Sequence, residues 1–303
     1  EIGPTGNFIV YTLTQPEDTI RKAKLKKVKK EDMPQDSLGI LLLKNDSVIK
    51  YPRLKSFGIS DENATWIAVI TSQDTKKDTS KAVKKIKPAK TPGDHLILFN
   101  AKTADTLQFD NVTEFFCPKK GGSIYFVQQK KDSLMTISSL KRLDTATSTV
   151  TGLYSSEGFL KKITADETGV KYSFLFSKDT AEVKAFSVYF GKISSDGPGI
   201  VADRDTPGMP QGWSPSENGS VYFSADAARL YFGTAPTPVP EPKDSTLEED
   251  KPRVDIWNWE DRTLQPQQKV DLEKEKKRSY PAVYNIDPKK FVQLADTNIT
   301  GIA

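Results

Sequence analysis

The sequence predicts an all-β fold of the β-propeller type, and three observations lead to it. A polar turn followed by a short run of β-branched and aromatic residues recurs along the 303-residue chain. The copies are regularly spaced, and a further pair of strand-like runs lies between consecutive copies. Each period therefore holds about four short antiparallel strands, which is the content of one propeller blade.

The clearest copy lies in residues 213–233, where two polar turns each precede a strand-like run. One aromatic residue in each copy serves as a marker, and the markers are 58, 59, 47, 59 and 60 residues apart. The six markers are Phe8, Trp66, Tyr125, Tyr172, Tyr231 and Phe291. About five to six units are thus visible, and we expect the marker aromatics to pack between blades. The turn aspartates Asp61, Asp166, Asp226 and Asp287 are expected to form the turns.

The strand-like runs between markers come in pairs joined by a polar turn. The pairs are Gly39–Leu43 with Ser47–Tyr51, Leu96–Asn100 with Thr106–Phe109, Leu134–Ile137 with Ser148–Val150, and Val254–Trp259 with Gln268–Val270. The period exceeds the ~40–45 residues of a lean blade. We assign the surplus to polar insertions at about 14–35, 73–94 and 234–252 within one propeller domain or segment, 1–303.

The first insertion is rich in lysine and resembles a helix at its start. Pro16 precedes Glu17 and Asp18, and the lysines come later, as the helix dipole prefers.

The number of repeat units bears on whether the propeller ring closes. The sequence covers about five periods plus an overlap. A family member with seven or eight blades of this length would need more residues, so we expect a segment of a longer protein and a ring that need not be complete.

The amino-acid composition argues against several classes of site and function. Cys117 is the single cysteine, so an internal disulfide and a cysteine-based zinc site are excluded, and the single histidine, His95, makes a nucleophile–base pair a poor expectation. The formal net charge of +4 does not imply a nucleic-acid partner, and no apolar run approaches the ~20 residues of a membrane span. The acid-base-acid cluster Asp203–Asp205 is read as a salt-linked loop. We assign no catalytic, cofactor-binding or metal-binding residue and expect no cofactor.

Several stretches together resemble the N-terminal β-propeller part of prolyl oligopeptidase-family serine peptidases, in the form found in Bacteroidetes-type bacteria. The run Val254–Gln268, with its Asp-Ile-Trp-Asn-Trp core, is the most specific of them. The others are Trp213–Pro215, Tyr231–Phe232, Glu275–Val283, Phe291–Ala295, Pro52–Leu54 and Phe57–Ser60. The resemblance spans most of the chain.

The resemblance implies a propeller placed over an α/β-hydrolase domain that carries the Ser, Asp and His and that is absent from this chain. The propeller would control which peptides reach that domain, its partner in the same polypeptide, and the protein would be exported, for example to the periplasm. A stand-alone propeller that binds a protein, peptide or glycan is the alternative, because fold alone does not decide function. Under both hypotheses we expect no catalysis by this chain alone. Under the first, the full-length parent would be a serine peptidase.

Overall fold

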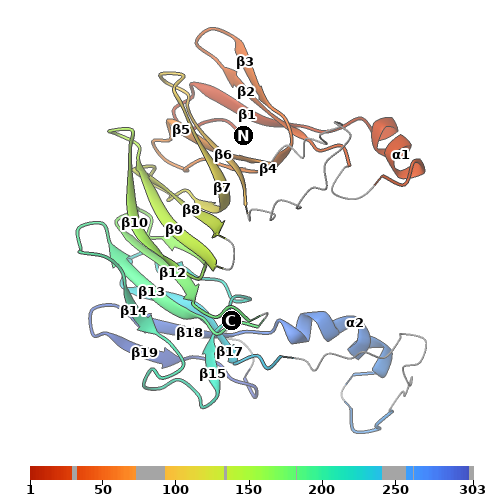
Figure 1. Ribbon diagram of the computed structural model, residues 1–303, viewed down its shortest axis with the longest axis vertical. Coiled ribbons are helices and arrows are strands. Elements are labelled where there is room, and N and C mark those ends of the chain that lie inside the picture. The colour runs from red at the N-terminus through yellow and green to blue at the C-terminus, as the bar shows by residue number, and fades with distance from the viewer. Residues whose placement is uncertain are drawn as a thin grey trace.

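The computed structural model describes residues 1–28, 33–72, 93–132, 135–181, 183–240, 257–261 and 263–299. Nearly all of the ordered structure is antiparallel β-sheet, as predicted. Figure 1 shows the sheets stacked face to face in an arc, with β1–β3 at one end and β15–β19 at the other. The sheets have the strand count and meander order of propeller blades, so the fold class is that of a β-propeller.

The first sheet and the first part of the second form the N-terminal end of the arc. The first sheet has the order β1-β2-β3 and the second the order β10-β9-β8-β7-β6-β5-β4. Their strands are β1 (Phe8–Leu13), β2 (Ser37–Leu42), β3 (Ser47–Tyr51), β4 (Leu54–Gly58), β5 (Trp66–Thr71), β6 (Asp94–Asn100), β7 (Thr106–Phe116), β8 (Ser123–Asp132), β9 (Met135–Asp144) and β10 (Thr149–Glu157).

The remaining strands form two further sheets, in the orders β11-β12-β13-β14 and β15-β17-β18-β19, with β16 also pairing with β17. These strands are β11 (Phe159–Ala165), β12 (Lys171–Ser177), β13 (Ser187–Lys192), β14 (Gly199–Ala202), β15 (Trp213–Pro215), β16 (Tyr222–Phe223), β17 (Arg229–Pro236), β18 (Tyr280–Asn285) and β19 (Lys290–Gln293). Helix α1 (Glu17–Leu25) lies between β1 and β2, and helix α2 (Gln265–Lys276) lies between β17 and β18.

Strand β7 belongs to two blades at once and explains the seven-stranded sheet. Its first half, Thr106–Phe109, pairs with β6, and its second half, Glu114–Phe116, pairs with β8. Between the halves Asn111 adopts a positive φ of 59°, and the register shifts on both sides. The bend lets one strand end the blade β4–β7 and begin the blade β7–β10.

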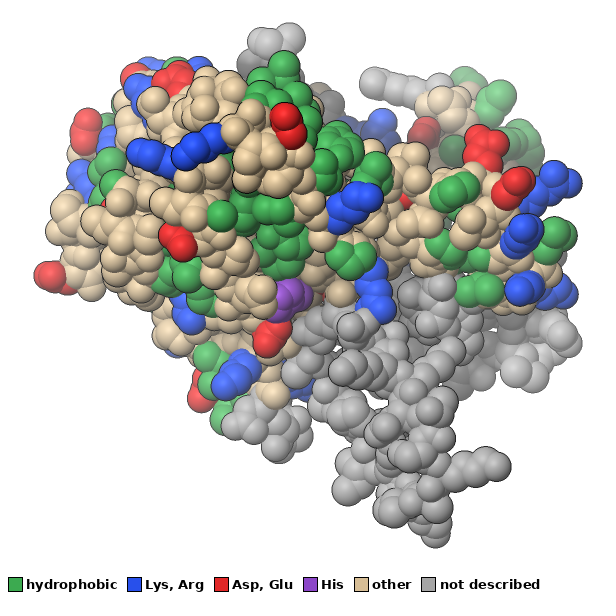
Figure 2. Space-filling model, turned by 90° about the horizontal axis from the view of Figure 1, so that it is seen from above, with side chains coloured by type: hydrophobic (Ala, Val, Ile, Leu, Met, Phe, Trp, Pro, Cys, Tyr) green, Lys and Arg blue, Asp and Glu red, His purple; other side chains and the backbone are tan. Residues whose placement is uncertain are grey.

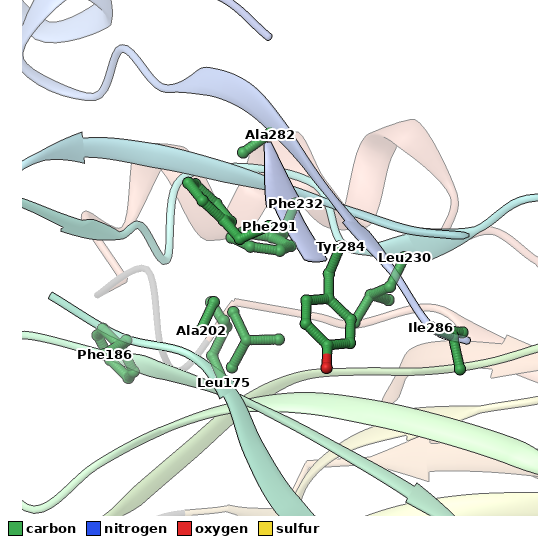
Figure 3. Packing of buried hydrophobic residues seen from close by; sticks show 10 residues of the cluster. Leu175, Phe186, Ala202, Leu230, Phe232, Ala282, Tyr284, Ile286 and Phe291 are labelled. Carbon is green, nitrogen blue, oxygen red and sulfur yellow. The ribbon is translucent and has the colours of Figure 1, made fainter. Parts of the chain in front are cut away.

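Four buried clusters hold successive sheets together. One joins β1–β3 to β5 and β6, the next joins β5 and β6 to β8 and β9, and the third joins β8 and β9 to β11 and β12. The fourth, drawn in Figure 3, places Leu175 and Ala202 of one sheet against Leu230, Phe232 and other residues of the last. Burying a side chain of this size contributes about 1.5–3 kcal/mol, so these layers dominate the stability.

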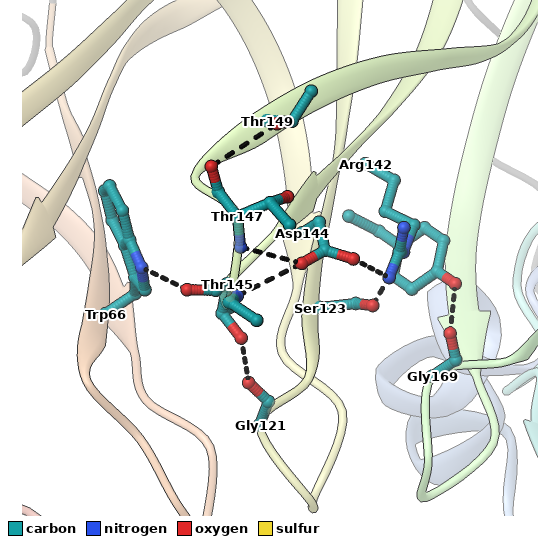
Figure 4. A network of polar contacts seen from close by, with 11 residues as sticks. Trp66, Gly121, Ser123, Arg142, Asp144, Thr145, Thr147, Thr149 and Gly169 are labelled. Atoms are coloured by element: carbon teal, nitrogen blue, oxygen red, sulfur yellow. Dashed lines mark hydrogen bonds and ion pairs between the residues drawn. The ribbon is translucent and has the colours of Figure 1, made fainter.

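The marker aromatics add polar cross-links between neighbouring blades (Figure 4). The indole nitrogen of Trp66 donates to the carbonyl of Thr145 at 3.2 Å, and the hydroxyl of Tyr125 donates to the carbonyl of Gly169 at 2.7 Å. The ring of Tyr125 also lies 5.8 Å from that of Tyr172. The expected packing of these three aromatics between blades is therefore confirmed.

The outward faces of the first and last sheets carry apolar rows. In the first sheet Ile2, Ile9, Leu41 and Val48 are successive cross-strand neighbours. Figure 2, which views the molecule from that end, shows hydrophobic side chains gathered there. In the last sheet the corresponding row is Tyr222, Tyr231, Val283 and Val292. Both rows resemble the faces that inner sheets bury. Ile2 is 68% and Tyr222 52% exposed, whereas Val283 in the second row is only 6% exposed.

Two predictions about the last blade are wrong. The run Gln268–Val270 was expected to be a strand, but it lies in helix α2, and Trp257–Trp259 are not in a strand. Pro266 stands in the first turn of the helix, Lys274 and Lys276 stand in its last turn, and good helix formers fill the middle. Residues 254–256 lie outside the described residues.

The sixth copy of the turn is also not equivalent to the others. Its turn joins β18 to β19, the last two strands of a blade, whereas Tyr231 lies on β17 after the turn from β16. Tyr231 itself packs within its own sheet, its ring 5.1 Å from that of Tyr222 and nearly parallel to it. Its predicted packing between blades is therefore wrong for the described structure.

We predict that Tyr125→Phe lowers the free energy of unfolding by about 1 kcal/mol, because it removes a buried hydrogen bond and leaves the Gly169 carbonyl without that donor. Tyr222→Phe is the matched control: its hydroxyl has no hydrogen bond in the described structure, so a change within a few tenths of a kcal/mol is expected. Urea unfolding followed by fluorescence measures both. Equal effects of the two substitutions would contradict the assigned role of the Tyr125 hydroxyl.

Candidate functional site

The long connections of the blades leave the sheets on one side of the arc, which we call the connection side. The joins from β5 to β6, β12 to β13 and β17 to β18 are all second-to-third strand connections of their blades. Because alternate turns of a meander lie at opposite sheet edges, these joins share one edge. Figure 1 shows α1 and α2 projecting from the same side.

Charged side chains link neighbouring blades. Glu114 on β7 accepts a hydrogen bond from the backbone N–H of Ile163 on β11 at 3.2 Å, through Oε2. Lys161 on β11 forms an ion pair with Glu217, which follows β15. Burial raises the pKa of the Glu114 carboxyl, against the opposing effect of the backbone donors and of Lys162 and Lys161.

Two hollows open on the connection side. One, of about 420 Å³, lies between the start of the β17–β18 connection and the end of α2, and Glu217, Glu275 and Arg278 line it. Its charges are largely satisfied within the protein, since Glu217 pairs with Lys161 and Glu275 with Arg278.

The second hollow, of about 560 Å³, lies where β8, β9, β10, β11 and the segment after β12 meet. Its lining residues are Lys131, Met135, Thr136, Ser156, Glu157, Gly158, Phe159, Lys178 and Thr180. The two hollows are neighbours, because the ammonium of Lys184, which lines the first, lies 4.4 Å from the ring centre of Phe159, which lines the second. We name the second hollow the Phe159 pocket.

The structure separates the two residues that composition had singled out. His95 lies at the surface, where Nδ1 is 2.7 Å from Oδ1 of Asp110, and its purple side chain is visible in Figure 2. Cys117 packs against the buried cluster between the second and third blades, and its sulfur would contact a Cβ added at Gly58. Burial raises the pKa of the Cys117 thiol to about 12, which is the character of a structural cysteine.

The aspartates behave as turn residues where the structure shows their contacts. Asp166 is buried and accepts from the backbone N–H groups of Val170 and Lys171, and Asp226 accepts from that of Ala228. The loop at Asp203 is held by hydrogen bonds with Thr206 and Asp205, and Arg204 has no ion pair within the described ranges. The predicted salt link of that loop is therefore wrong.

Sequence reasoning missed the residues of the Phe159 pocket. They come from four separate segments between Lys131 and Thr180, and each alone has the composition of an ordinary strand end or turn. Among the described residues no group of three or more His, Cys, Asp and Glu is arranged to hold a metal ion. No helix there is long and apolar enough to cross a membrane.

Fold and surface together define an all-β protein of propeller type with a hollowed connection side. No family model and no curated protein matches the chain. Solved structures resemble it at low identity, with TM-scores below 0.5. TolB from Acinetobacter baumannii is 12% identical with a TM-score of 0.41, over 96% of this chain and 53% of that one.

Two peptidases also resemble the chain. The β-propeller domain of the Trilobed protease from Pyrococcus furiosus is 12% identical with a TM-score of 0.45, over 95% of this chain and 68% of that one. The acylaminoacyl peptidase of Pyrococcus horikoshii is 13% identical with a TM-score of 0.43, over 77% of this chain and 34% of that one. This chain thus spans about half the length of TolB and about a third of that peptidase.

We predict that Cys117 reacts with a thiol reagent such as 5,5′-dithiobis(2-nitrobenzoate) only on unfolding. A pKa of about 12 leaves almost no thiolate at pH 8, and the packed cluster excludes the reagent. Absorbance should rise by one thiol equivalent in 6 M guanidinium chloride and stay flat in buffer. Fast labelling of the native protein would contradict this burial.

Glu114→Gln should raise the resistance to urea at pH 7.5, and the gain should vanish below about pH 4. The folded-state pKa of Glu114 lies above its ordinary value of 4.5, so folding favours the protonated carboxyl. Its contribution to stability is present below 4.5 and is lost as the pH rises through the folded-state pKa. Gln imitates the protonated form and still accepts from Ile163. The control Glu157→Gln, at an exposed residue, should shift the urea midpoint little at either pH. A gain independent of pH would contradict the assignment.

Proposed function

We propose that this chain is a non-catalytic β-propeller part of a prolyl oligopeptidase-like serine peptidase, which controls how peptides reach an α/β-hydrolase domain of the same polypeptide. The observation that carries the proposal is the pair of outward apolar rows. A sheet face with a continuous row of apolar residues in register is costly to leave in water. Such rows on both end sheets support an arc that further protein covers.

The connection side supports the gating role. The described part of this side combines hollows, charged side chains and two projecting helices, whereas the inter-blade layers are built mainly of buried apolar side chains. A surface of this kind suits contact with polar, variable ligands such as peptides. The sequence resemblance supplies the class of partner, and export to the periplasm is proposed on the same ground.

A stand-alone binding propeller is the second candidate, favoured by the α2 segment. Trp257 and Trp259 are 64% and 90% exposed, and helix α2 has no buried residue. Exposed tryptophans are frequent in protein interfaces. In this alternative the segment would bind another protein directly, without a hydrolase domain.

The decisive experiment is to read the gene downstream of residue 303 and to label the full-length product with a fluorophosphonate. We expect a Gly-x-Ser-x-Gly sequence followed by Asp and His, and labelling of that serine alone. The isolated chain 1–303 should remain unlabelled. A gene that ends at Ala303 would refute the proposal, and labelling of a serine within 1–303 would refute the non-catalytic role.

A second measurement tests control of access. In the full-length protein, removal of the propeller should increase cleavage of unfolded casein relative to cleavage of a short chromogenic peptide by about tenfold or more. The intact protein should cleave the short peptide and leave casein largely uncut. An unchanged ratio, with the hydrolase domain shown to be folded by its active-site labelling, would contradict the gating role.

A further inference from the structure

The Phe159 pocket combines an apolar wall with two lysines. Phe159 and Met135 supply the apolar surface, and the flexible thioether of Met135, half exposed, can adapt to different side chains. Lys131, at the end of β8, and Lys178, directly after β12, have no ion pair within the described ranges. Two lysines from different blades thus line one hollow.

Neutral hydrogen-bonding groups complete the lining. The hydroxyls of Thr136, Ser156 and Thr180 make no hydrogen bond in the described structure. Glu157, also at the pocket, has no cation partner there. The pocket therefore offers positive charge, hydroxyls and one carboxylate, so a ligand must bring negative charge and polar amide groups together with an apolar part.

The base of the pocket is fixed by the fold. Gly158 has a φ of 137°, and a Cβ there would lie 2.3 Å from the carbonyl oxygen of Ser177, so only glycine fits. Its N–H donates to the carbonyl of Thr136 at 2.8 Å, and its carbonyl accepts from the hydroxyl of Ser138 at 2.7 Å. The ring of Phe159 is held by the Lys184 ammonium. A pocket built this way is pre-formed, which reduces the cost of binding.

We propose that the Phe159 pocket binds the free C-terminal residue of a peptide, with the carboxylate between Lys131 and Lys178 and an apolar side chain against Phe159 and Met135. A volume of about 560 Å³ is in the range of small-ligand sites and accommodates one or two residues. The inference deepens the proposed function, because it names the end of the peptide that the propeller holds. It requires no hydrolase domain for its test.

The test compares two ligands that differ in one group, N-acetyl-Ala-Ala-Phe with a free carboxylate and the same peptide as its C-terminal amide. Binding to chain 1–303 is followed by titration calorimetry at low salt. We expect the carboxylate form to bind at least tenfold more tightly. In Lys131→Gln/Lys178→Gln this preference should fall to less than twofold, while Lys44→Gln, at an exposed lysine in the turn before β3, should retain it.

Two further arms separate the site from a general charge effect. Phe159→Leu should weaken both peptides, and circular dichroism together with the unfolding midpoint checks that the variant is folded. Free phenylalanine should bind more weakly than the acetylated tripeptide if the amide groups contact the hydroxyls. Equal binding of the two tripeptides, or a preference that persists in the double lysine variant, would overturn the proposal. Those results leave the downstream-gene test untouched, so failures of the two proposals are distinguishable.

Discussion

The burial of sheet faces against one another is the constraint on which the rest of this structure depends. Each inner sheet presents large apolar side chains on both faces. Successive side chains of a strand point to opposite faces, and both faces are covered by a neighbouring sheet. Leu175 faces the last sheet, whereas Phe174 and Phe176 on the same strand face the third blade. Strand order, turn placement and the side on which connections emerge follow from stacking such two-sided sheets.

The contacts that are specific rather than merely apolar lie at the same interfaces. Trp66 and Tyr125 each bring a polar atom into the inter-blade layer and satisfy it on a backbone carbonyl of the next blade. Burying an indole N–H or a phenol O–H without such a partner would cost about 1–3 kcal/mol. These bonds therefore fix how far one sheet can slide over the next, which apolar contact alone does not do.

Much of the fold could be predicted from the sequence because its signals are local. Turn residues and alternating strands mark β2 with β3, β6 with β7, and β9 with β10 directly. The position of Phe291 in its blade was mispredicted because the same turn chemistry serves any two strands of a blade, and only the pairing shows which two. The pocket residues could not be predicted, since Lys131, Phe159 and Lys178 become neighbours only when three strand ends meet.

Because two blades share strand β7, the unfolding of one of them is coupled to the unfolding of the other. In a stack of separate sheets, one layer can open while its neighbours remain folded, as in a repeat array. Here the same eleven-residue strand closes one blade and opens the next, with its bend at Asn111. Detaching β7 from β8 removes the edge of both, so the blades β4–β7 and β7–β10 should act as a single cooperative unit. The sheets β1–β3, β11–β14 and β15–β19 share no strand with a neighbour, so a single sheet should open more easily there than in the unit that contains β7.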